Sequence, residues 1–330
     1  MAVDFSEFNR IVIIRLSSLG DVLLTTPLIR SIKKKNPSIQ IDFVVRKEFI
    51  EAIQNNPNLS EIFLYGNSKN EREILFKSVQ SKKYELVIDL QNNFRSREIT
   101  RLLNCKTLRF NKNNIKKFLL VHFKINLLKD TAQIPKRYAE AAGLIELDEK
   151  GLDFYTENHP DEGLKKDLKY IGICPGAKHF TKRWPKEYYI ELGKKLESSG
   201  YKIVLFGGED ELQICNEIQN KLTSAINLCN TNLKQTAANM KKCEAVFTND
   251  SGLMHLTSAV GVPVIAFFGS TVKEFGFFPY KAKCLILENE NLSCRPCTHI
   301  GRESCPKTHF KCMLETKPDL AFDSLTRLVG

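Results

Sequence analysis

Four consecutive residues, Asn-Asp-Ser-Gly at 249–252, have the types and the position of a phosphate-binding turn. Apolar runs and a helical pattern around them predict a strand, a helix and a second strand, at 244–248, 253–260 and 262–268. In such a parallel unit the ligand binds where a strand ends and a helix begins, because the helix start offers unpaired N–H groups and partial positive charge. The alternative is that Asp250 or Ser251 only caps the helix.

A basic loop precedes this turn in the same half of the chain. Lys178, Lys182 and Arg183 follow a predicted strand and glycine turn at 170–176, and their charges can neutralise a departing diphosphate without a metal. Glu211, in the first turn of a later predicted helix, can accept hydrogen bonds from ribose hydroxyls. The alternatives are solvated basic side chains and a carboxylate that only complements the helix dipole. Glycines that let backbone approach a ligand stand nearby, at Gly176, Gly207, Gly208 and Gly252.

The N-terminal half offers Asp21 for acid–base chemistry, in the turn after the apolar run 10–16. A carboxylate at the mouth of a strand–helix turn can point into a cleft and take a proton from an attacking hydroxyl. The helix start lowers the pKa of this carboxyl, so proton removal must be concerted with attack. A helix cap is the alternative role. Arg95 and Arg97, after the predicted strand 84–90, either face the same cleft or open a solvated helix.

Length and composition indicate a soluble protein of two domains. The chain has 330 residues, and its 42% apolar and 26% charged residues are typical of globular proteins. No run approaches the ~18 apolar residues of a membrane span, and the N-terminus lacks the basic-then-apolar order of a secretory signal. We therefore expect a cytoplasmic protein whose ten cysteines are mostly reduced.

The net charge of +11 favours an anionic partner. Nucleic acid is not expected, because the sequence has no zinc finger, aromatic-flanked basic strand or basic helix with heptads. The segment 106–129 has seven basic residues and no acidic one. Its apolar residues fall on one predicted helical face, Phe118, Val121, Ile125 and Leu128, with Leu119 and Phe123 beside it. Such a helix can rest on an anionic membrane, or it can pack on its own domain with its lysines in water.

Strands and helices alternate in both halves, which predicts two α/β layers with parallel sheets and a ligand-binding cleft between them. The expected strands of the first half are at 10–16, 41–45, 62–66 and 84–90, and a helix is expected at 22–35. The second half has strands at 170–176, 201–208, 226–229, 244–248 and 262–268, and helices at 209–222 and 233–241. A polar segment, 156–169, is typical of a linker. The first turn lacks G-x-G-x-x-G, which argues against hydride transfer.

Four cysteines near the C-terminus approach the spacing of a four-thiolate zinc site, namely Cys294, Cys297, Cys305 and Cys312. The spacings after the first pair are short for a zinc ribbon. Buried thiols and conditional disulfides are the alternatives, and the pattern does not decide among the three.

These stretches resemble a known family, the lipopolysaccharide heptosyltransferases of glycosyltransferase family 9. The resemblance runs in order over nearly the whole chain, through IVIIRLSSLGDVLL, DLQNNFRSR, CPGAKHFTKRWPKEYY, LFGGEDE, TNDSGLMHLTSAVGVPVIAFFGST and CRPC…CPKTHFKCM. It implies a GT-B fold, with two Rossmann-like domains facing each other across a cleft. It also implies metal-independent, inverting transfer from ADP-heptose to the lipid A–Kdo core of lipopolysaccharide.

By analogy with the family, Asp21 is the general base, Lys182 holds the diphosphate and Glu211 contacts the ribose. Donor contacts are further implied for Gly176, Ala177, Asp250, Ser251, Gly252 and His255, and acceptor contacts for Ser18, Gly20 and Arg95. No cofactor and no metal are expected. The implied partners are ADP-heptose or a similar nucleotide sugar, a phosphorylated lipopolysaccharide core acceptor, and the inner-membrane surface.

We therefore expect an enzyme associated with the inner face of the cytoplasmic membrane. Residues 1–162 are predicted to bind the acceptor and 163–318 the nucleotide sugar. For the last helix, 319–330, we consider packing back on the N-terminal domain. Three alternatives stay open: a family 9 transferase with another nucleotide sugar or acceptor, a sugar-nucleotide epimerase of the same architecture, and a binding protein without turnover.

Overall fold

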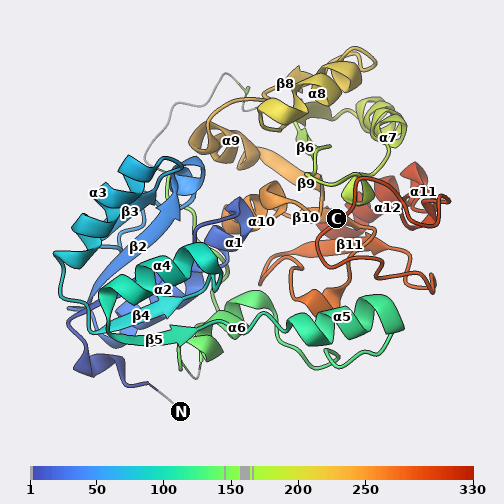
Figure 1. Ribbon diagram of the computed structural model, residues 1–330. Coiled ribbons are helices and arrows are strands. Elements are labelled where there is room, and N and C mark those ends of the chain that lie inside the picture. The colour runs from blue at the N-terminus through green and yellow to red at the C-terminus, as the bar shows by residue number, and fades with distance from the viewer. Residues whose placement is uncertain (1–2, 145, 157–163, 166) are drawn as a thin grey trace. The chain divides into compact units, whose positions relative to one another are not determined.

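The computed structural model divides the chain into two compact α/β units (Figure 1). It describes residues 3–144, 146–156, 164–165 and 167–330. One unit consists of Met1–Asn113 and Ala132–Tyr155, and the other of Asn114–Thr131 and Thr156–Gly330. All strand pairings in both sheets are parallel, so the predicted fold class of two α/β layers with parallel sheets is confirmed.

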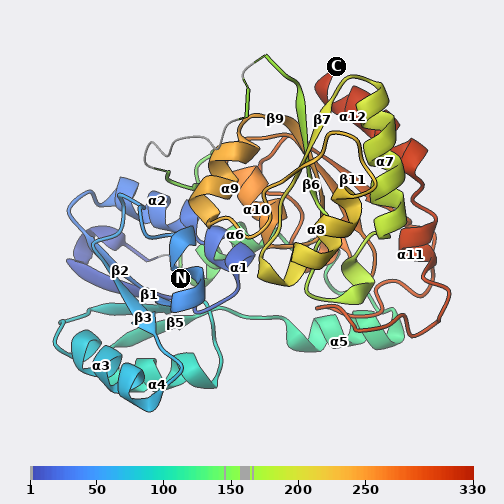
Figure 2. The same ribbon diagram turned by 90° about the horizontal axis from the view of Figure 1, so that it is seen from above.

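The first unit is built on a five-stranded sheet in the order β3-β2-β1-β4-β5. The strands are β1 (Arg10–Ile14), β2 (Gln40–Arg46), β3 (Glu61–Tyr65), β4 (Leu86–Asp89) and β5 (Lys106–Arg109). The helices are α1 (Leu19–Leu23), α2 (Thr26–Lys35), α3 (Lys69–Gln80), α4 (Phe94–Leu103) and α6 (Ile134–Ala141), with short turns η1 (Phe5–Glu7) and η2 (Lys47–Ala52). The helices α3 and α4 cover one face of the sheet (Figure 2). The central strands are nearly continuous apolar runs because both of their faces are buried.

The predicted helix 22–35 is two helices in the structure, α1 and α2. Pro27 occupies the start of α2, where its missing N–H costs no hydrogen bond, so the chain begins a second helix there. The short helix α1 therefore ends soon after Asp21, and this residue lies in its first turn.

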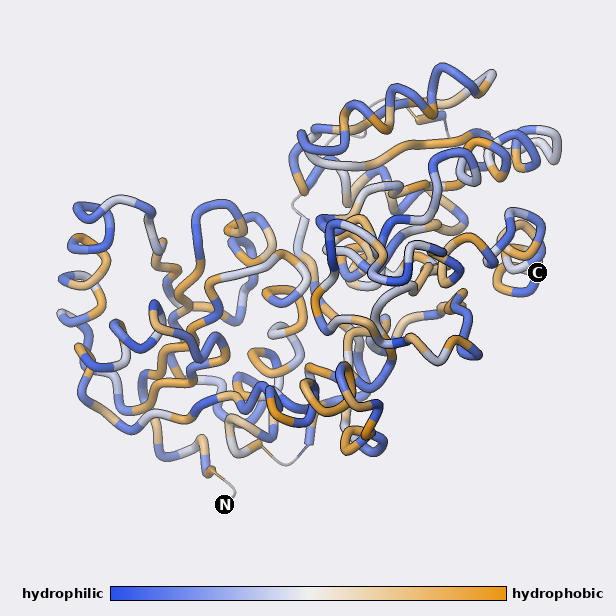
Figure 3. The backbone as a smooth tube through the Cα atoms, turned by 45° about the vertical axis from the view of Figure 1, so that its right-hand side comes forward, coloured by the Kyte–Doolittle hydropathy of each residue, from blue (hydrophilic) through white to orange (hydrophobic). Residues whose placement is uncertain are grey.

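The second unit has a six-stranded sheet in the order β11-β10-β9-β6-β7-β8. The strands are β6 (Tyr170–Cys174), β7 (Lys202–Leu205), β8 (Ile226–Asn227), β9 (Cys243–Asn249), β10 (Val264–Phe268) and β11 (Cys284–Glu288). The longer helices are α5 (Asn114–Phe123), α7 (Lys186–Ser198), α8 (Leu212–Gln219), α9 (Leu233–Met240), α10 (Gly252–Ala259) and α12 (Pro318–Val329). Short helical segments are η3 (Phe180–Lys182), η4 (Glu209–Glu211), η5 (Lys273–Phe275) and α11 (Lys311–Leu314). The helices α7, α8 and α12 pack on one face of the sheet and α10 on the other, through apolar residues. Figure 3 colours the backbone by hydropathy, with the hydrophobic stretches in orange.

The domain limits differ from those expected from the sequence. The helix α5 belongs to the second unit, because Leu120, Val121 and Leu128 pack on Phe275. The last helix, α12, contributes to the core of the second unit. The predicted boundary at 162/163 lies outside the described residues, and so does much of the predicted linker.

The basic segment 106–129 is not one helix, and in this respect the prediction is wrong. Its first residues form the edge strand β5, and α5 ends at Phe123. Val121 and Leu128 are buried, whereas Phe118 and Ile125, predicted on the same face, are exposed. No helix in the described part of the chain is long and apolar enough to cross a membrane.

Candidate active site

The turn between β9 and α10 lies where the sequence predicted it, with Ser251 directly before the helix. Asn249 is fully buried at the end of β9. Its side-chain oxygen accepts hydrogen bonds from the backbone N–H of Trp184 (2.9 Å) and the hydroxyl of Tyr189 (3.1 Å). Its amide donates to the carbonyl of Pro175 (2.8 Å). Asn249 therefore fixes the loop after β6 against the end of β9.

Lys182 and Asp250 form an ion pair in this turn. The Lys182 Nζ lies 2.7 Å from the Asp250 Oδ2, which also accepts a hydrogen bond from the Thr271 hydroxyl at 2.7 Å. The carboxylate is buried, while the lysine side chain keeps 17% of its surface exposed. An ammonium has three donor hydrogens, so the contact with Asp250 leaves Lys182 able to bind a phosphate oxygen.

The start of α10 offers a further hydrogen-bonding group beside this pair. The Ser251 Oγ is buried and has no hydrogen-bond partner among the described residues. A buried hydroxyl of this kind is unfavourable unless another group satisfies it. Gly252 is the first residue of α10, and His255 is buried one turn further on. The backbone N–H groups at this helix start and the Ser251 hydroxyl together suit an anion.

Glu211 lies at the carboxyl end of β7, where its Oε2 accepts a hydrogen bond from the backbone N–H of Gly208 (2.7 Å). A Cβ atom at Gly176 would lie 2.1 Å from the Glu211 Cγ, and one at Gly207 would lie 2.8 Å from the Glu211 Cβ. The Glu211 side chain thus fills the space beside these two glycines. This packing explains why both positions hold glycine, and the sequence does not reveal it. A pocket of about 230 Å³ opens here, lined by Gly176, Glu211, Arg183, Lys186, Asp210, Gln213, Ile214 and Glu217.

The basic loop after β6 is folded back on itself by Arg183. Its Nε donates a 2.6 Å hydrogen bond to the carbonyl of Ala177, and its Nη2 donates one of 3.4 Å to the carbonyl of Lys178. Ala177 is buried and Lys178 is exposed. The guanidinium of Arg183 therefore shapes the loop that carries Lys182.

In the first unit, Asp21 is the third residue of α1 and binds three side chains. Its Oδ1 lies 2.6 Å from the Arg15 Nη2, and the Tyr138 hydroxyl is 3.5 Å from the same oxygen. Its Oδ2 accepts hydrogen bonds from the hydroxyl (3.1 Å) and the backbone N–H (3.3 Å) of Ser18. Asp21 thus takes part in a capping box, as the alternative interpretation held, while 19% of its side chain stays exposed.

The surroundings of Asp21 favour its charged form. Burial opposes ionisation, but the Arg15 guanidinium and the hydrogen bonds from Ser18 outweigh it, so the pKa of the Asp21 carboxyl lies below its ordinary value. Burial raises the pKa of the Tyr138 phenol, which stays protonated. At neutral pH Asp21 is therefore a carboxylate, the form that can accept a proton.

The DLQNN motif holds the turn that carries Asp21. The Gln91 Oε1 accepts a hydrogen bond from the backbone N–H of Leu16 (3.0 Å), and the Asp89 Oδ1 accepts one from that of Gln91 (3.1 Å). Arg95 is exposed on the first turn of α4 and makes none of the contacts that hold Asp21. The structure thus brings together Ser18 and Asp21, with Gly20 in the same turn, but gives Arg95 no part in the network.

Comparison with known proteins decides the family. A model of glycosyltransferase family 9 (heptosyltransferase) matches residues 72–307. The chain belongs to this family. It is 27% identical over 320 residues to lipooligosaccharide heptosyltransferase 2 of Campylobacter jejuni, covering 94% of this chain and 96% of that one. The enzyme is therefore a glycosyltransferase.

Solved structures agree with this assignment. A family 9 glycosyl transferase from Veillonella parvula is 26% identical, with a TM-score of 0.73 over 87% of this chain and 88% of that chain. The E. coli ADP-heptose LPS heptosyltransferase II is 24% identical, with a TM-score of 0.73 over 97% of this chain and 98% of that chain. These likenesses confirm the predicted GT-B class, with two Rossmann-like units.

Two arginines of this family 9 enzyme position site residues although their sequence signals are weak. Arg15 binds Asp21, and its only sequence signal is a charge at the end of an apolar strand pattern. Arg295 is buried and donates hydrogen bonds to the carbonyls of Thr271 (2.8 Å) and Gly269 (2.5 Å). Arg295 thereby fixes the loop that contains Thr271, and the Thr271 hydroxyl binds the Asp250 carboxylate that pairs with Lys182. Arg295 stands inside C-R-P-C, a motif that we interpreted only through its thiols.

Lys112 also lies near the Asp21 carboxylate, a position that the sequence did not indicate. Burial and the nearby Arg15 guanidinium lower the pKa of the Lys112 ammonium, and the Asp89 and Asp21 carboxylates partly oppose this. The Asp21 carboxylate is thus contacted by Arg15, Ser18 and Tyr138, and the Lys112 ammonium interacts with it electrostatically.

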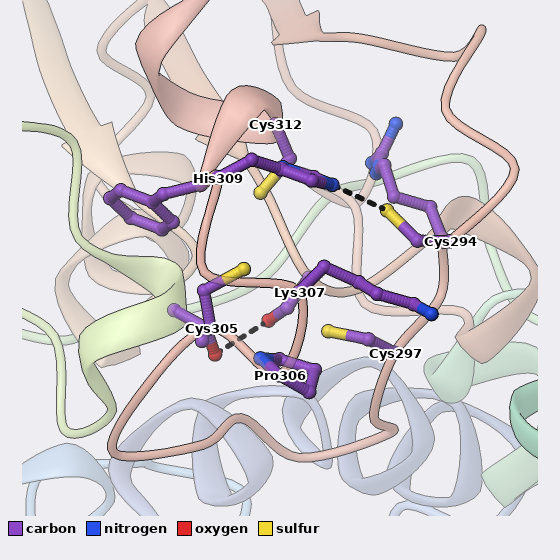
Figure 4. Close-up of a pocket in the computed structure, with 11 residues that line it drawn as sticks. Cys294, Cys297, Cys305, Pro306, Lys307, His309 and Cys312 are labelled. Atoms are coloured by element: carbon purple, nitrogen blue, oxygen red, sulfur yellow. Dashed lines mark hydrogen bonds between the residues drawn. The ribbon is translucent and has the colours of Figure 1, made fainter.

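The C-terminal cysteines line a small pocket of about 10 Å³ (Figure 4). All ten cysteines of the chain are free thiols in the structure. The Cys294 Sγ lies 3.9 Å from the His309 Nε2, and burial raises the pKa of Cys312 to about 12. Over the described ranges, no group of three or more His, Cys, Asp and Glu side chains is arranged to hold a metal ion. The four cysteines of this motif are free thiols in the structure, and of these only Cys312 is buried.

Proposed function

We propose that this family 9 enzyme transfers heptose from ADP-heptose to the inner core of a lipid A–Kdo acceptor. The observation that carries the proposal is the Lys182–Asp250 ion pair beside the start of α10. This pair orients the Lys182 ammonium at the proposed diphosphate site, where its charge can stabilise the departing nucleotide diphosphate. Relatives named heptosyltransferase match nearly the whole chain, and the E. coli relative is named for ADP-heptose. Both facts favour this donor over other nucleotide sugars.

In this proposal the second unit binds the donor. Lys182, the Ser251 hydroxyl and the N–H groups from Gly252 onward contact the diphosphate, and Gly176 and Ala177 line the phosphate pocket. Glu211 accepts hydrogen bonds from the ribose, because its carboxylate borders the 230 Å³ pocket. Asp250 acts mainly by orienting Lys182, and His255 lies on the sugar side of the same turn.

The first unit binds the acceptor, with Ser18, Gly20 and Arg95 contributing, and Asp21 acts as the general base. The acceptor oxygen attacks the anomeric carbon of heptose while its proton passes to the Asp21 carboxylate. The bond from that carbon to the diphosphate breaks at the same time, and ADP departs with its charge balanced by Lys182. One direct displacement inverts the anomeric centre, and no metal takes part.

The acceptor is linked to a lipid, so we propose that the enzyme works at the inner face of the cytoplasmic membrane as a peripheral protein. The net charge of +11 suits the anionic surface of that membrane. The phosphorylated sugar core of the acceptor would meet the same positive field.

The deciding experiment is incubation of the pure enzyme with ADP-heptose, with and without a lipid A–Kdo acceptor, followed by mass spectrometry. The proposal predicts that an acceptor heavier by one heptose and ADP form in equal amounts, also in the presence of EDTA. Conversion of ADP-heptose without acceptor would identify an epimerase instead. Binding of ADP-heptose without any turnover would identify a binding protein. Parallel assays with UDP- and GDP-sugars test whether a relative of ADP-heptose is the true donor.

A further inference from the structure

The outward face of α5 and of the loop after it is apolar. Five large side chains in thirteen residues are each about half exposed or more: Ile115 (77%), Phe118 (53%), Phe123 (62%), Ile125 (49%) and Leu127 (53%). We call these five residues the α5 patch. Scattered single apolar residues are normal on a protein surface, but five exposed large apolar side chains within one short segment indicate contact with another apolar phase.

The α5 patch is presented by a firmly attached segment. Leu120, Val121 and Leu128 pack on Phe275 on the inner side. The Lys124 Nζ donates hydrogen bonds to the backbone carbonyls of Cys294 (3.1 Å) and Pro296 (2.7 Å) of the same unit. In Figure 1, α5 lies at the edge of the second unit. The inner side of the segment is thus already occupied, so the patch is not a core face that merely lacks its partner.

Two aromatic rings of the patch lie against each other. The rings of Phe118 and Phe123 are 6.0 Å apart in an edge arrangement, and that of Phe118 is 4.4 Å from the His122 ring. Clustered aromatic side chains next to polar groups are typical of surfaces that insert at the boundary between lipid headgroups and acyl chains.

The charges around the patch indicate which apolar phase it meets. The stretch 114–129 has four lysines and no acidic residue. Lys116 and Lys129 are exposed, whereas Lys117 is buried and Lys124 is bound to the Cys294 loop. Exposed lysines flanking apolar side chains complement anionic headgroups. A second copy of this chain would instead bring the same positive charges to the contact, which disfavours a symmetric dimer there.

We propose that the α5 patch docks the enzyme on an anionic bilayer, with Phe118 and Phe123 inserted at the interface and Lys116 and Lys129 at the headgroups. The docking gives a physical route to a lipid-linked acceptor and in that respect rests on the proposed function. The vesicle binding itself needs no sugar transfer, so the two proposals can fail separately.

The test is co-sedimentation of the full chain with vesicles of equimolar phosphatidylglycerol and phosphatidylcholine, and with vesicles of phosphatidylcholine alone. We expect the wild type to bind the anionic vesicles. The double variant Phe118→Ser with Phe123→Ser should bind them with an affinity at least about tenfold lower. Lys116→Gln with Lys129→Gln should weaken binding and reduce its dependence on salt. Leu320→Ser removes an apolar side chain of similar exposure (43%) from α12 and should leave binding unchanged.

Thermal unfolding of each variant shows that the fold is retained, which is expected because all substituted side chains are exposed. No binding of the wild type to anionic vesicles, or equal binding by the wild type and the phenylalanine double variant, would overturn the proposal. So would a wild-type dimer in sedimentation that the double variant abolishes, because a second copy would then cover the patch. Vesicle binding without heptose transfer would leave the docking intact and refute the proposed reaction alone.

Discussion

The ammonium of Lys182 lies 2.7 Å from the carboxylate of Asp250, two residues that sequence analysis had assigned to the donor separately. The hydroxyl of Thr271 donates a hydrogen bond to Asp250. The backbone carbonyl of Thr271 in turn accepts a hydrogen bond from Arg295. A chain of contacts from the C-R-P-C motif to the phosphate-binding turn therefore orients one cation. The positive charge of Lys182 is therefore oriented before the reaction begins, so no reorganisation is needed when the leaving group departs.

The ion pair predicts non-additive effects of substitution. Lys182→Met should weaken ADP binding by about tenfold to a hundredfold, because a charge-assisted contact is lost. Asp250→Asn should weaken it less, and the double variant should be close to Lys182→Met alone, because both residues act through the same ammonium. Isothermal titration with ADP measures all three. Fully additive losses would show that Asp250 binds the nucleotide independently.

The Arg15–Asp21 contact predicts a shift in the pH dependence of transfer. The pKa of Asp21 is below its ordinary value in the folded protein, so the ionised carboxylate stabilises the fold above the unfolded pKa, and this contribution is lost as pH falls through the folded pKa. Arg15→Gln removes the main group that lowers this pKa and leaves burial, which raises it. The acid limb of kcat/KM should then move to higher pH by about one unit or more.

Arg15→Lys is the matched control for this shift, since it keeps the positive charge, and its acid limb should stay close to that of the wild type. An acid limb that does not move in Arg15→Gln would mean that Asp21 is not the titrating group. Circular dichroism at each pH separates a change in catalysis from acid unfolding.

The packing of Glu211 predicts different results at two neighbouring glycines. Gly176→Ala places a Cβ 2.1 Å from the Glu211 Cγ, so the carboxylate must move, at an expected cost of about 1–3 kcal/mol in the free energy of unfolding. The KM for the donor should rise as the ribose contact is lost. Gly208→Ala meets only the end of the same side chain, at 3.2 Å, and should have the smaller effect on both quantities. Denaturant unfolding and donor titration measure them, and equal effects of the two substitutions would contradict this role of Glu211.

Much of the fold could be predicted because its signals are local. The apolar runs at 244–248 and 262–268 and the polar turn between them became β9, β10 and the start of α10. The strand β11 and the edge strand β5 were missed, because their short or half-exposed patterns are weak. The segment 106–129 was misassigned as one helix, since its apolar spacing continues past Phe123, where the structure turns to pack Leu128 on Phe275.

The site could be predicted only in part. The sequence reveals the positions that follow the carboxyl ends of strands. These positions include Asp21, Lys182 and the turn 249–252. Their partners follow no periodic pattern: Arg15 binds Asp21 from the end of the preceding strand, and Asn249 binds Trp184, which lies 65 residues earlier. Periodicity carries no information on such pairs, because tertiary packing brings them together.

The most direct test of the central claim compares the wild type with Asp21→Asn in one reaction, with ADP-heptose and a lipid A–Kdo acceptor. Asparagine keeps the shape of the side chain but cannot accept the proton. The account predicts that the variant loses heptose transfer by at least about a hundredfold, while it binds ADP with the wild-type Kd. Transfer at the wild-type rate by Asp21→Asn, or loss of ADP binding with residual transfer, would contradict it.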